Sequence, residues 1–530
     1  MPANKSAITT HQLSFQLDTG EWLFNDLNLN LNEKIAGLVG RNGVGKSVLV
    51  SLLSGQRIPT KGSVITKGKV GYYSQLPSDL IDSQRTIAEF MGVSKQLSAL
   101  KSIQKGSSEQ RDFDVVAEDW TIEERVISDL LSLRIPADPS VRCRSLSGGQ
   151  LALLQLHRLF QSDYEVLLLD EPTNHLDAIG RDWLIKHMQR FDGVILLVSH
   201  DRVLLNQVEA IYQLTRLGVD HFSGNYDAYL QQSRIAEQAL NKRIEGLKSE
   251  QKKLMRQAQT NKEKREQRES KGKQLRKSGS QPKILMDAMK NKAEQSQSAG
   301  LRNQRNQMDR NQSKLAVLEI QQETVKPQAL YVQQAQDLKK RTLLRVTNGM
   351  LDYGSDKEMT FTVSQSERLH LDGPNGSGKS MLLKAIHGKH SHYNGEIKRY
   401  AKTVYMDQNF GMLASTDSIL ESLLKHSDGL VEGTARILLA GIGFRRDSVY
   451  RKVAHLSGGE KMKLSMLLVS HIADGPLLLL DEPDNHLDIE SKQRLATALN
   501  QYKGAFILVS HDAFFIDAVG INKVLTFYNL

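Results

Sequence analysis

The chain has 530 residues, 39% of them hydrophobic, and a formal net charge of +10 at pH 7. Because single cores rarely grow past about 250–300 residues, this length predicts several domains. A lone cysteine, Cys143, excludes an internal disulfide and a cysteine-ligated zinc or iron–sulfur centre. No apolar run approaches the ~18 residues of a membrane helix, and residues 1–12 lack the apolar core of a secretory signal. We therefore expect a cytoplasmic protein.

The positive charge is concentrated in the middle of the chain. Residues 231–340 carry 25 Lys and Arg against 12 Asp and Glu, an excess of 13, which leaves the rest of the chain at −3. A localised basic excess of this kind indicates where a polyanion would bind.

One eight-residue pattern, G-x-x-x-x-G-K-[ST], occurs twice, 333 residues apart. In this pattern the glycines let the backbone wrap around phosphate, the Lys bonds terminal phosphate oxygens, and the Ser hydroxyl reaches Mg2+. Two copies, each followed by the same further motifs, predict that the chain binds two nucleoside triphosphates. The predicted nucleotide-binding residues are Gly40, Arg41, Asn42, Gly43, Val44, Gly45, Lys46 and Ser47, and then Gly373, Pro374, Asn375, Gly376, Ser377, Gly378, Lys379 and Ser380.

Residues 1–230 form the first predicted unit. Alternating apolar residues indicate short strands between positions 11 and 32, and residues 34–39 form the strand that leads into the first phosphate loop. A helix should follow over 46–53. Residues 70–75 then bring Gln75 to the end of a strand.

Later motifs of this unit follow buried strands or begin helices. Ser147, Gly148, Gly149 and Gln150 should begin an amphipathic helix. The continuous apolar runs 166–169 and 194–198 are typical of parallel strands buried on both faces. The first run delivers Asp170 and Glu171, and the second delivers His200.

The second predicted unit, residues 341–530, repeats this order. Asp170 to Asp481 and His200 to His511 are both offsets of 311 residues. The interval from Gln75 to the Ser-Gly-Gly motif is 72 residues, but only 49 separate Gln408 from its counterpart. The first unit therefore carries an insertion of 23 residues, placed at about 94–118, which is either a tolerated surface loop or a small projecting arm.

The segment between the units, residues 231–340, predicts a helical hairpin. Residues 231–330 contain no Phe, Trp or Tyr, so an ordinary core is not available there. Narrow apolar seams at helical spacing run through Ile244, Leu247 and Leu254, and through Leu301, Met308, Leu315 and Leu318. Ser, Gly and Pro at 278–282 break the pattern, so we expect the turn at about 270–285. Forty helical residues would reach roughly 60 Å.

Triphosphate hydrolysis requires held phosphates, a positioned Mg2+ and a water in line with the leaving group. Asp170 and Asp481 end apolar strands and are the predicted metal-side carboxylates, with Ser47 and Ser380. Glu171 and Glu482 follow them directly and are placed to polarise the water, while His200 and His511 could bond the terminal phosphate. Gln75 and Gln408 can couple the metal and the water to moving parts.

A further anion site is predicted where Ser-Gly-Gly begins a helix. Because each phosphate loop already supplies one such site, this helix is expected to cap a nucleotide held by the opposite unit. The sequence here resembles the ATP-binding cassette superfamily over about four-fifths of the chain. The resemblance implies an α/β fold of two P-loop cassettes joined by a long α-helical hairpin, an ATP hydrolase that uses ATP and Mg2+.

The resemblance also pairs the motifs across the two units. One site joins Lys46, Ser47, Gln75, Asp170, Glu171 and His200 to Ser457, Gly458, Gly459 and Glu460; the other joins Lys379, Ser380, Gln408, Asp481, Glu482 and His511 to Ser147, Gly148, Gly149 and Gln150. Both sites keep the water-polarising Glu, so both are expected to hydrolyse ATP.

The sequence resembles the ABC-F family in four features. These are the tandem cassettes, the sequence of residues 170–177, the basic linker, and the sequence of residues 223–226 just before it. That family implies an ATPase that binds the ribosome at its tRNA exit site in the ATP-closed state and leaves on hydrolysis. Its linker tip points toward the peptidyl-transferase centre, and its members regulate translation or protect ribosomes from antibiotics. The insertion falls where the family has a ribosome-contacting arm. The implied partners are rRNA and, as a further candidate, P-site tRNA, with no membrane and no obligate protein partner.

Some positions depart from the family pattern. Asp484 stands where the first unit has Thr173, and Leu153 and Lys463 stand where Arg is usual. A base-stacking aromatic is predicted at Tyr353, with Phe15 and Leu17 as weaker counterparts in the first unit. The chain has no long tail after His511, which argues against members with a C-terminal DNA-binding coiled coil.

Three interpretations of the function remain. A basic linker without aromatic residues favours contacts with the phosphate backbone and the shape of folded RNA, and binding of this kind depends steeply on salt. The alternative is that the linker is a solvated charged helix pair, as most charge runs are. A fused ATPase subunit of a membrane transporter would leave the basic hairpin unexplained. A DNA-associated ATPase would be distinguished by salt-dependent binding to duplex DNA and to ribosomes.

Overall fold

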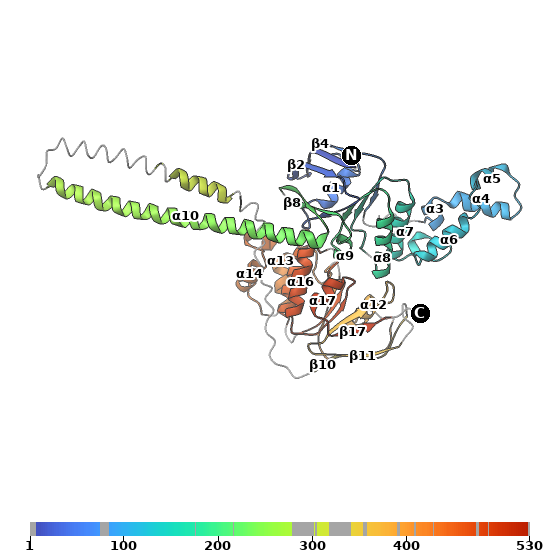
Figure 1. Cartoon of the computed structure of the whole chain (residues 1–530). Helices are drawn as coiled ribbons and strands as arrows, with labels where there is room; N and C mark the ends of the chain where they lie inside the picture. Colours follow the sequence, from blue (N-terminus) through green and yellow to red (C-terminus); the bar gives the residue numbers. More distant parts are fainter. Residues whose placement is uncertain are drawn as a thin grey trace. The chain divides into compact units, whose positions relative to one another are not determined.

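The computed structural model describes most of the chain, and its parts are shown in Figure 1. The described residues are 7–74, 84–174, 176–215, 217–277, 302, 305–316, 318, 341–352, 358–389, 393–407, 410–427, 429–472, 476–485 and 487–527. The chain divides into two compact units, Met1–Asp227 together with Gln328–Leu530, and Ala228–Pro327. The first unit contains two cassettes, each with its own sheets.

The first cassette contains two sheets. A three-stranded antiparallel sheet has the order β2-β1-β4, and a six-stranded sheet has the order β5-β6-β7-β3-β8-β9, parallel except for β9. The strands β3, β6 and β7 are apolar runs buried along almost their whole length, as the sequence predicts for central parallel strands. The strand bounds are β1 Ile8–Gln16, β2 Trp22–Leu31, β3 Ile35–Val39, β4 Lys61–Thr66, β5 Val70–Tyr73, β6 Val166–Asp170, β7 Val194–Val198, β8 Ala210–Thr215 and β9 Gly218–Ser223.

Helices of the first cassette follow the strands that deliver the motifs. The predicted helix over 46–53 is α1, Lys46–Leu53. The others are α3 Ile87–Met91, α4 Ser94–Gln104, α5 Gln110–Val116, α6 Ile122–Ser132, α7 Gly148–Gln161, α8 Ala178–Arg190 and α9 Arg202–Leu205, with a 3-10 turn at Cys143–Ser145. Strand register brings Asp170 opposite Val198, so the carboxyl ends of β6 and β7 lie side by side.

The 94–118 insertion folds as α4 and α5, connected to α6. Leu97, Leu100 and Val116 are buried in one apolar cluster with residues of α6, and the rings of Phe113 and Trp120 meet edge to face. This segment is therefore helical, and its buried side chains share one apolar cluster with α3, α6 and α7 (Figure 1).

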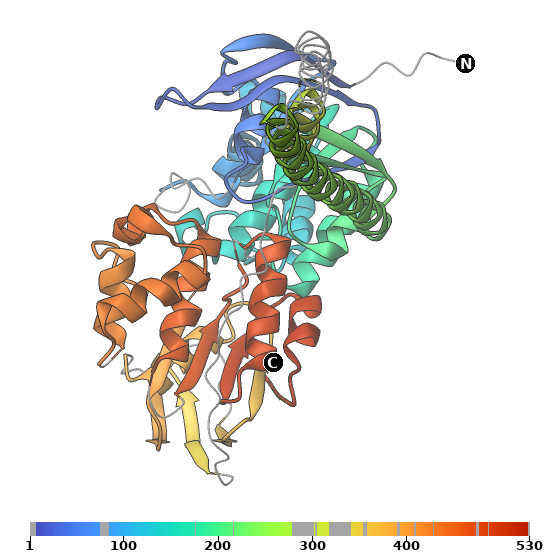
Figure 2. The ribbon, with the colours of Figure 1, turned by 90° about the vertical axis from the view of Figure 1, so that its left-hand side faces the viewer.

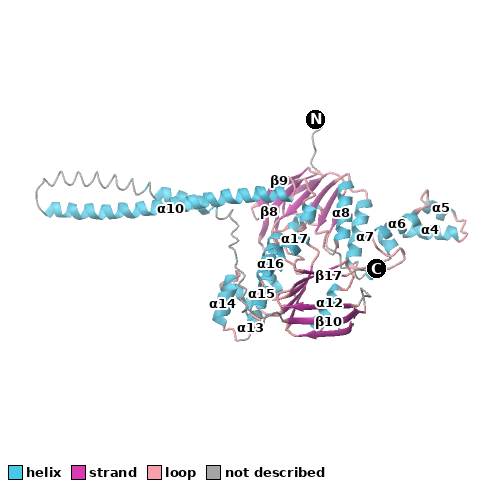
Figure 3. Ribbon diagram, turned by 60° about the horizontal axis from the view of Figure 1, so that its bottom comes forward, coloured by secondary structure: helices cyan, strands magenta, loops and turns pink. Residues whose placement is uncertain are grey.

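The second cassette repeats the two-sheet plan (Figure 3). Its antiparallel sheet has the order β11-β10-β13 and its parallel sheet the order β14-β15-β16-β12-β17. The strands are β10 Thr342–Leu351, β11 Met359–Ser364, β12 Arg368–Asp372, β13 Tyr393–Arg399, β14 Thr403–Asp407, β15 Leu477–Asp481, β16 Phe506–Val509 and β17 Lys523–Thr526. The helices are α12 Lys379–His387, α13 Ile419–His426, α14 Glu432–Gly441, α15 Gly458–Ser470, α16 Ile489–Gln501 and α17 Ala513–Val519, with 3-10 turns at Arg446–Tyr450 and Val453–His455.

The second compact unit, Ala228–Pro327, is the region between the two cassettes in the sequence, and it is built on one long helix, α10 (Tyr226–Lys277), of 52 residues. At 1.5 Å per residue its length is about 78 Å. The predicted seam residue Ile244 is buried, as is Leu315 on the returning segment. The Nδ2 of Asn311 donates to Glu250 Oε2 at 3.1 Å, so the segment 305–316 lies beside α10 (Figure 2). The turn predicted at about 270–285 is wrong in its first part, because residues 270–277 continue α10; the rest of that range and Leu301 lie outside the described residues.

The helices of the described ranges do not include a membrane-spanning one. Within those ranges, no helix combines the length and the apolar character that crossing a bilayer requires.

Candidate nucleotide-binding sites

Both phosphate loops have the backbone that the motif requires. Gly45 and Gly378, each directly before a helix, have φ values of 105° and 95°, in the left-handed region that favours glycine. A Cβ on Gly45 would lie 2.7 Å from the side chain of Leu23, so a larger residue does not fit there. Helices α1 and α12 begin at the motif lysines. Their first N–H groups, which lack partners within a helix, are thus available to an anion.

The two motif lysines are held across their own loops. Lys46 Nζ donates to the carbonyls of Gly40 and Arg41 at 2.7 and 3.2 Å. Lys379 Nζ donates in the same way to Gly373 and Pro374, at 2.6 and 2.8 Å. Burial lowers the pKa of Lys46, although Glu171, Asp488 and Asp170 oppose that shift. Each ammonium group therefore lies against its own phosphate loop, where the terminal phosphate oxygens of a bound nucleotide would accept its hydrogen bonds.

Oxygen ligands suited to Mg2+ meet at the end of each central strand. Asp481 accepts from Ser380 Oγ at 2.8 Å through Oδ1 and from the Tyr405 hydroxyl at 2.7 Å through Oδ2. In the first cassette, burial raises the pKa of Asp170, and a hydrogen bond from Ser47 opposes the rise. Asp170 Oδ1 is buried and has no hydrogen-bond partner among the described residues.

These donor sets fit a magnesium ion that is shared with phosphate. Mg2+ is usually bound by one or two carboxylates plus substrate phosphates and water. Within the described residues, no group of three or more His, Cys, Asp or Glu side chains could hold a metal by itself. Among the described residues, each cassette therefore offers one hydroxyl and one carboxylate to such an ion.

The two predicted water-polarising glutamates have an unusual backbone. Glu171 and Glu482 have φ values of 50° and 49°, rare for residues other than glycine. Their N–H groups donate to Val198 and Val509 on the neighbouring strands, at 2.8 and 2.9 Å. Left-handed non-glycine residues cluster at functional sites, where the surrounding structure holds the strain. The same conformation therefore recurs at corresponding positions of both cassettes and agrees with the role predicted for these two glutamates.

Electrostatics favours a proton-accepting role for these glutamates near neutral pH. Burial raises the pKa of Glu171 to about 7, and burial and Asp481 raise the pKa of Glu482 to about 7. His200 Nε2 lies 3.4 Å from Glu171 Oε1, and His511 Nε2 lies 3.8 Å from Glu482 Oε1. Burial lowers the pKa of His200 well below its usual value and that of His511 to about 4, so both imidazoles are neutral at pH 7.

A cavity of about 480 Å³ opens between the two cassettes. From the first cassette, its lining includes the predicted residues Asn42, Gly43, Gly45, Lys46, Ser47, Asp170, Glu171 and His200; from the second, Asn375, Glu482 and His511. Leu17 lines it as well, whereas Phe15 contacts the ring of Phe24. The structure therefore brings residues of both predicted sites together around one space.

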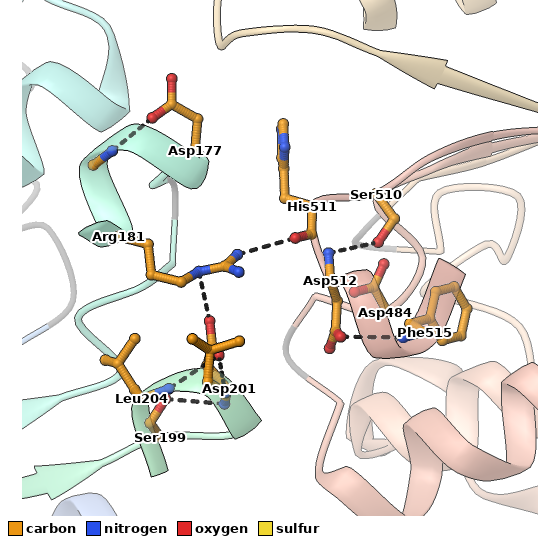
Figure 4. Close-up of polar contacts among 12 residues, drawn as sticks. Asp177, Arg181, Ser199, Asp201, Leu204, Asp484, Ser510, His511, Asp512 and Phe515 are labelled. Carbon is orange, nitrogen blue, oxygen red and sulfur yellow. Dashed lines mark hydrogen bonds and ion pairs between the residues drawn. The ribbon is translucent and has the colours of Figure 1, made fainter. Parts of the chain in front are cut away.

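Polar contacts cross directly from one cassette to the other. Asn42 N donates to Asp488 Oδ2 at 3.0 Å, so the first phosphate loop touches the loop before α16. Arg181 on α8 donates to the carbonyl of His511 at 3.0 Å, and its Nε lies 2.8 Å from Asp201 Oδ2 (Figure 4). Each cassette thus contacts a motif of the other.

The signature segments begin helices, as predicted. Ser147 and Gln150 form a capping box at α7, and Ser457 and Glu460 form one at α15. Neither segment is among the described lining residues of the cavity. Their role opposite the phosphate loops therefore stays a prediction, and Gln75, Gln408 and Tyr353 lie outside the described residues.

Sequence reasoning assigned no role to several polar residues at the interface between the cassettes. Asp488, Arg181 and Asp201 make the contacts above, and Lys492 and Asp512 occupy the positions equivalent to Arg181 and Asp201. The constant offset of 311 residues relates these pairs, so the repeat could have selected them. Their function could not have been inferred from it, because each acts through contacts with residues distant in the sequence.

Comparison with known proteins decides the family. The sequence model of the family described as "ABC transporter" matches residues 24–174 and 357–485, which together are more than half of the chain. ABC transporter F family member 5 of Arabidopsis thaliana is 29% identical over 93% of this chain and 70% of its own length. The chain belongs to the ABC-F family of ATPases. As an ABC-F ATPase it binds and hydrolyses ATP.

Other relatives of this ABC-F ATPase carry names from translation. The ribosome protection protein VmlR of Bacillus subtilis is 26% identical over 98% of this chain and 87% of its own. The energy-dependent translational throttle protein EttA of Escherichia coli is 28% identical over 91% and 85%. Among solved structures, the archaeal ribosome recycling factor aABCE1, in complex with the stalk protein aP1, has a TM-score of 0.56 at 18% identity. That match covers 98% of this chain and 88% of that chain and shows a shared fold.

Proposed function

We propose that this ABC-F ATPase binds the ribosome at its tRNA exit site region in the ATP-closed state. There it would regulate translation or protect the ribosome from antibiotics, and ATP hydrolysis would release it. The observation that carries this proposal is a long basic helix, α10, between two cassettes that both keep the Asp and Glu of the hydrolytic site. The names of VmlR and EttA, which refer to ribosome protection and translation, support it.

The polyanion-binding surface is proposed to lie on α10. This helix carries 15 Lys and Arg against seven Asp and Glu. Between Ser233 and Ala258 the seam positions are partly or fully buried and almost all the others are exposed. Exposed cations that neutralise phosphates release counterions, which makes binding fall steeply with salt. Apart from Tyr226 and Tyr229 in its first turn, the helix has no aromatic side chain, so it is suited to phosphate and shape contacts with folded RNA rather than to base stacking.

Each proposed site divides the hydrolytic work among named residues. Lys46 or Lys379 holds the terminal phosphate, and Mg2+, when bound by the Ser–Asp pair, would neutralise the charge that develops on the phosphates. Glu171 or Glu482 accepts a proton from the attacking water at its side-chain oxygen, which a pKa of about 7 permits at neutral pH. His200 or His511, neutral and beside the Glu, is placed to bond the terminal phosphate. The Ser-Gly-Gly helix of the opposite cassette completes each site in the closed state.

The test is sedimentation with ribosomes. Glu171→Gln with Glu482→Gln keeps the shape of both sites but removes the proton acceptors, so the protein should remain ATP-bound and sediment with ribosomes in ATP. Adding Lys46→Ala and Lys379→Ala should return it to the free fractions. If the Glu-to-Gln protein sediments free of ribosomes while it retains ATP, the proposal is wrong.

A second comparison addresses α10. Lys252→Gln with Lys253→Gln removes two exposed charges from the helix, whereas Lys67→Gln with Lys503→Gln removes two exposed charges from the cassettes. We expect the first pair to weaken ribosome binding and to reduce the salt slope by roughly one to two, about 0.9 for each phosphate that the helix no longer neutralises. The second pair should change neither, and equal effects of the two pairs would contradict an α10 contact.

A further inference from the structure

One polar cluster at the interface differs between the cassettes although its positions correspond. In the first cassette it contains Thr173, Arg181 and Asp201; the same positions of the second cassette, 311 residues on, are Asp484, Lys492 and Asp512. The structure places all of these except Thr173 in described ion pairs or hydrogen bonds. All six line the cavity between the cassettes.

In the second cassette an ammonium group lies between two carboxylates. Lys492 Nζ lies 2.8 Å from Asp512 Oδ2 and 3.9 Å from Asp484 Oδ2. The Asp484 side chain is only 3% exposed, and its Oδ1 has no hydrogen-bond partner among the described residues. Burial raises the pKa of Asp484, and the charge of Lys492 opposes that rise. A carboxylate buried this deeply requires its cation.

This ion pair joins the two ends of one short loop. Asp484 lies two residues after Glu482, at the start of the loop, and Lys492 lies in the first turns of α16, at its end. The N–H of Lys492 donates to the carbonyl of Asp488 at 2.9 Å, one helical turn earlier. Asp484 and Lys492 therefore lie on either side of Asp488 in the sequence, each four residues from it, and their ion pair connects the two sides.

Asp488 contacts the nucleotide site of the other cassette. Its Oδ1 caps α16 by accepting from Ser491 N at 2.8 Å, and its Oδ2 accepts from Asn42 N in the first phosphate loop at 3.0 Å. On the same face, Arg41 Nε lies 3.3 Å from Glu490 Oε2. The loop that Asp484 and Lys492 brace thus acts on the first phosphate loop, although both residues belong to the second cassette.

The corresponding loop of the first cassette is braced differently. Thr173 carries no charge, and the guanidinium of Arg181 forms an ion pair with Asp201 and donates a hydrogen bond to the backbone carbonyl of His511 across the interface (Figure 4). Arginine can bond two partners at once because its donors form a planar fork, whereas lysine acts as a point charge. The two nucleotide sites therefore meet loops that are held by different chemistry.

We propose that Asp484 and Lys492 are positioning residues for the first nucleotide site: their ion pair holds Asp488 against Asn42 and so favours ATP turnover there over turnover at the second site. The proposal rests on the assignment of Lys46, Glu171 and His200 to the first site and of their counterparts to the second. It adds that the two sites turn over ATP at different rates, because Asp484 and Lys492 of the second cassette act on the first site across the interface.

The test measures the first turnover of each site separately. In Glu482→Gln protein only the first site keeps its proton acceptor, and in Glu171→Gln protein only the second does. Single-turnover hydrolysis of labelled ATP is followed in both backgrounds with Asp484, with Asp484→Thr, which copies the first cassette, and with Asp484→Asn, which keeps the side-chain shape. Thr173→Ser is the matched control at the equivalent position.

We expect Asp484→Thr to slow the first site about tenfold and the second site by less than twofold. Asp484→Asn should give the same pattern, and Lys492→Arg, which keeps the charge, should restore most of the loss that Lys492→Met causes. A residue that only stabilised its own cassette would slow the second site at least as much, because Asp484 lies beside Glu482. An equal fall at both sites, a fall confined to the second, or no fall overturns the proposal.

A further control separates this proposal from the site assignment. Lys46→Ala in the Glu482→Gln background should abolish the remaining first turnover. If turnover persists, the assignment of the first site is itself wrong and the proposal falls with it. If turnover is abolished but Asp484→Thr has no effect, only the positioning role is refuted.

Discussion

The buried glutamate of the first site should destabilise the protein above neutral pH. Glu171 has a pKa of about 7 in the folded protein because burial disfavours its charge, and an ordinary value of 4.5 when unfolded. The folded state therefore binds the proton more tightly. The stability that comes from the protonated form is fully present below about pH 4.5 and is lost as the pH rises through 7.

The size of this effect follows from the shift in pKa. A difference of 2.5 units corresponds to about 3 kcal/mol above pH 7, and to about 1 kcal/mol at pH 5. The side chain is 20% exposed to the cavity, so 3 kcal/mol is an upper value. Glu171→Gln resembles the protonated form at every pH, and it should stabilise the apo protein by about 2–3 kcal/mol at pH 8 and by about 1 kcal/mol at pH 5.

Urea unfolding of the apo protein at pH 5 and pH 8 measures both values. Glu118→Gln is the control, because Glu118 is exposed and its neutralisation should change stability little at either pH. A stabilisation by Glu171→Gln that is the same at pH 5 and pH 8, or a destabilisation at pH 8, would refute the reasoning from burial.

Three further predictions concern activity and stability. The rate of ATP hydrolysis should rise with pH through about 7, because Glu171 and Glu482 accept protons only when ionised; a rate that is flat between pH 6 and 8 would contradict this. Gly45→Ala should lose nucleotide binding in a filter assay and lower the free energy of unfolding in urea by at least ~1–2 kcal/mol, because φ is 105° and the new Cβ meets Leu23. Unchanged binding would show that the loop adopts another backbone conformation that still holds the nucleotide. Arg181→Ala should cost about 3 kcal/mol, because it leaves the nearly buried Asp201 unpaired, and Arg181→Lys should recover part of that loss; equal losses from the two would mean that charge is not the cause.

The fold could be predicted because its signals are local. The buried strands β6 and β7 follow runs of consecutive apolar residues, and α1 begins at the Lys of a motif whose glycines set the backbone. The heptad seam of α10 likewise indicated its helical character, with Ile244 buried as the pattern requires. Each of these features depends on residues that are neighbours in the sequence.

The geometry of the sites could be predicted only in part. The repeat selected the Asp, Glu and His of each site, but the left-handed backbone of Glu171 arises from its bond to the neighbouring strand at Val198. The contact of Asn42 with Asp488 joins positions 446 residues apart. The hydroxyl of Tyr405 on Asp481 depends on how β14 and β15 align. Such contacts are set by tertiary packing, which one sequence without its fold does not specify.

The carboxyl group of Asp488 serves two cassettes with its two oxygens. One oxygen closes the first turn of its own helix, and the other takes a proton donor from the opposite phosphate loop. Any rearrangement of that loop that pulls on the shared group must also loosen or rotate the start of α16. A conformational change in the first phosphate loop can therefore reach α16 of the second cassette directly through the Asp488 carboxylate, without intermediate side chains.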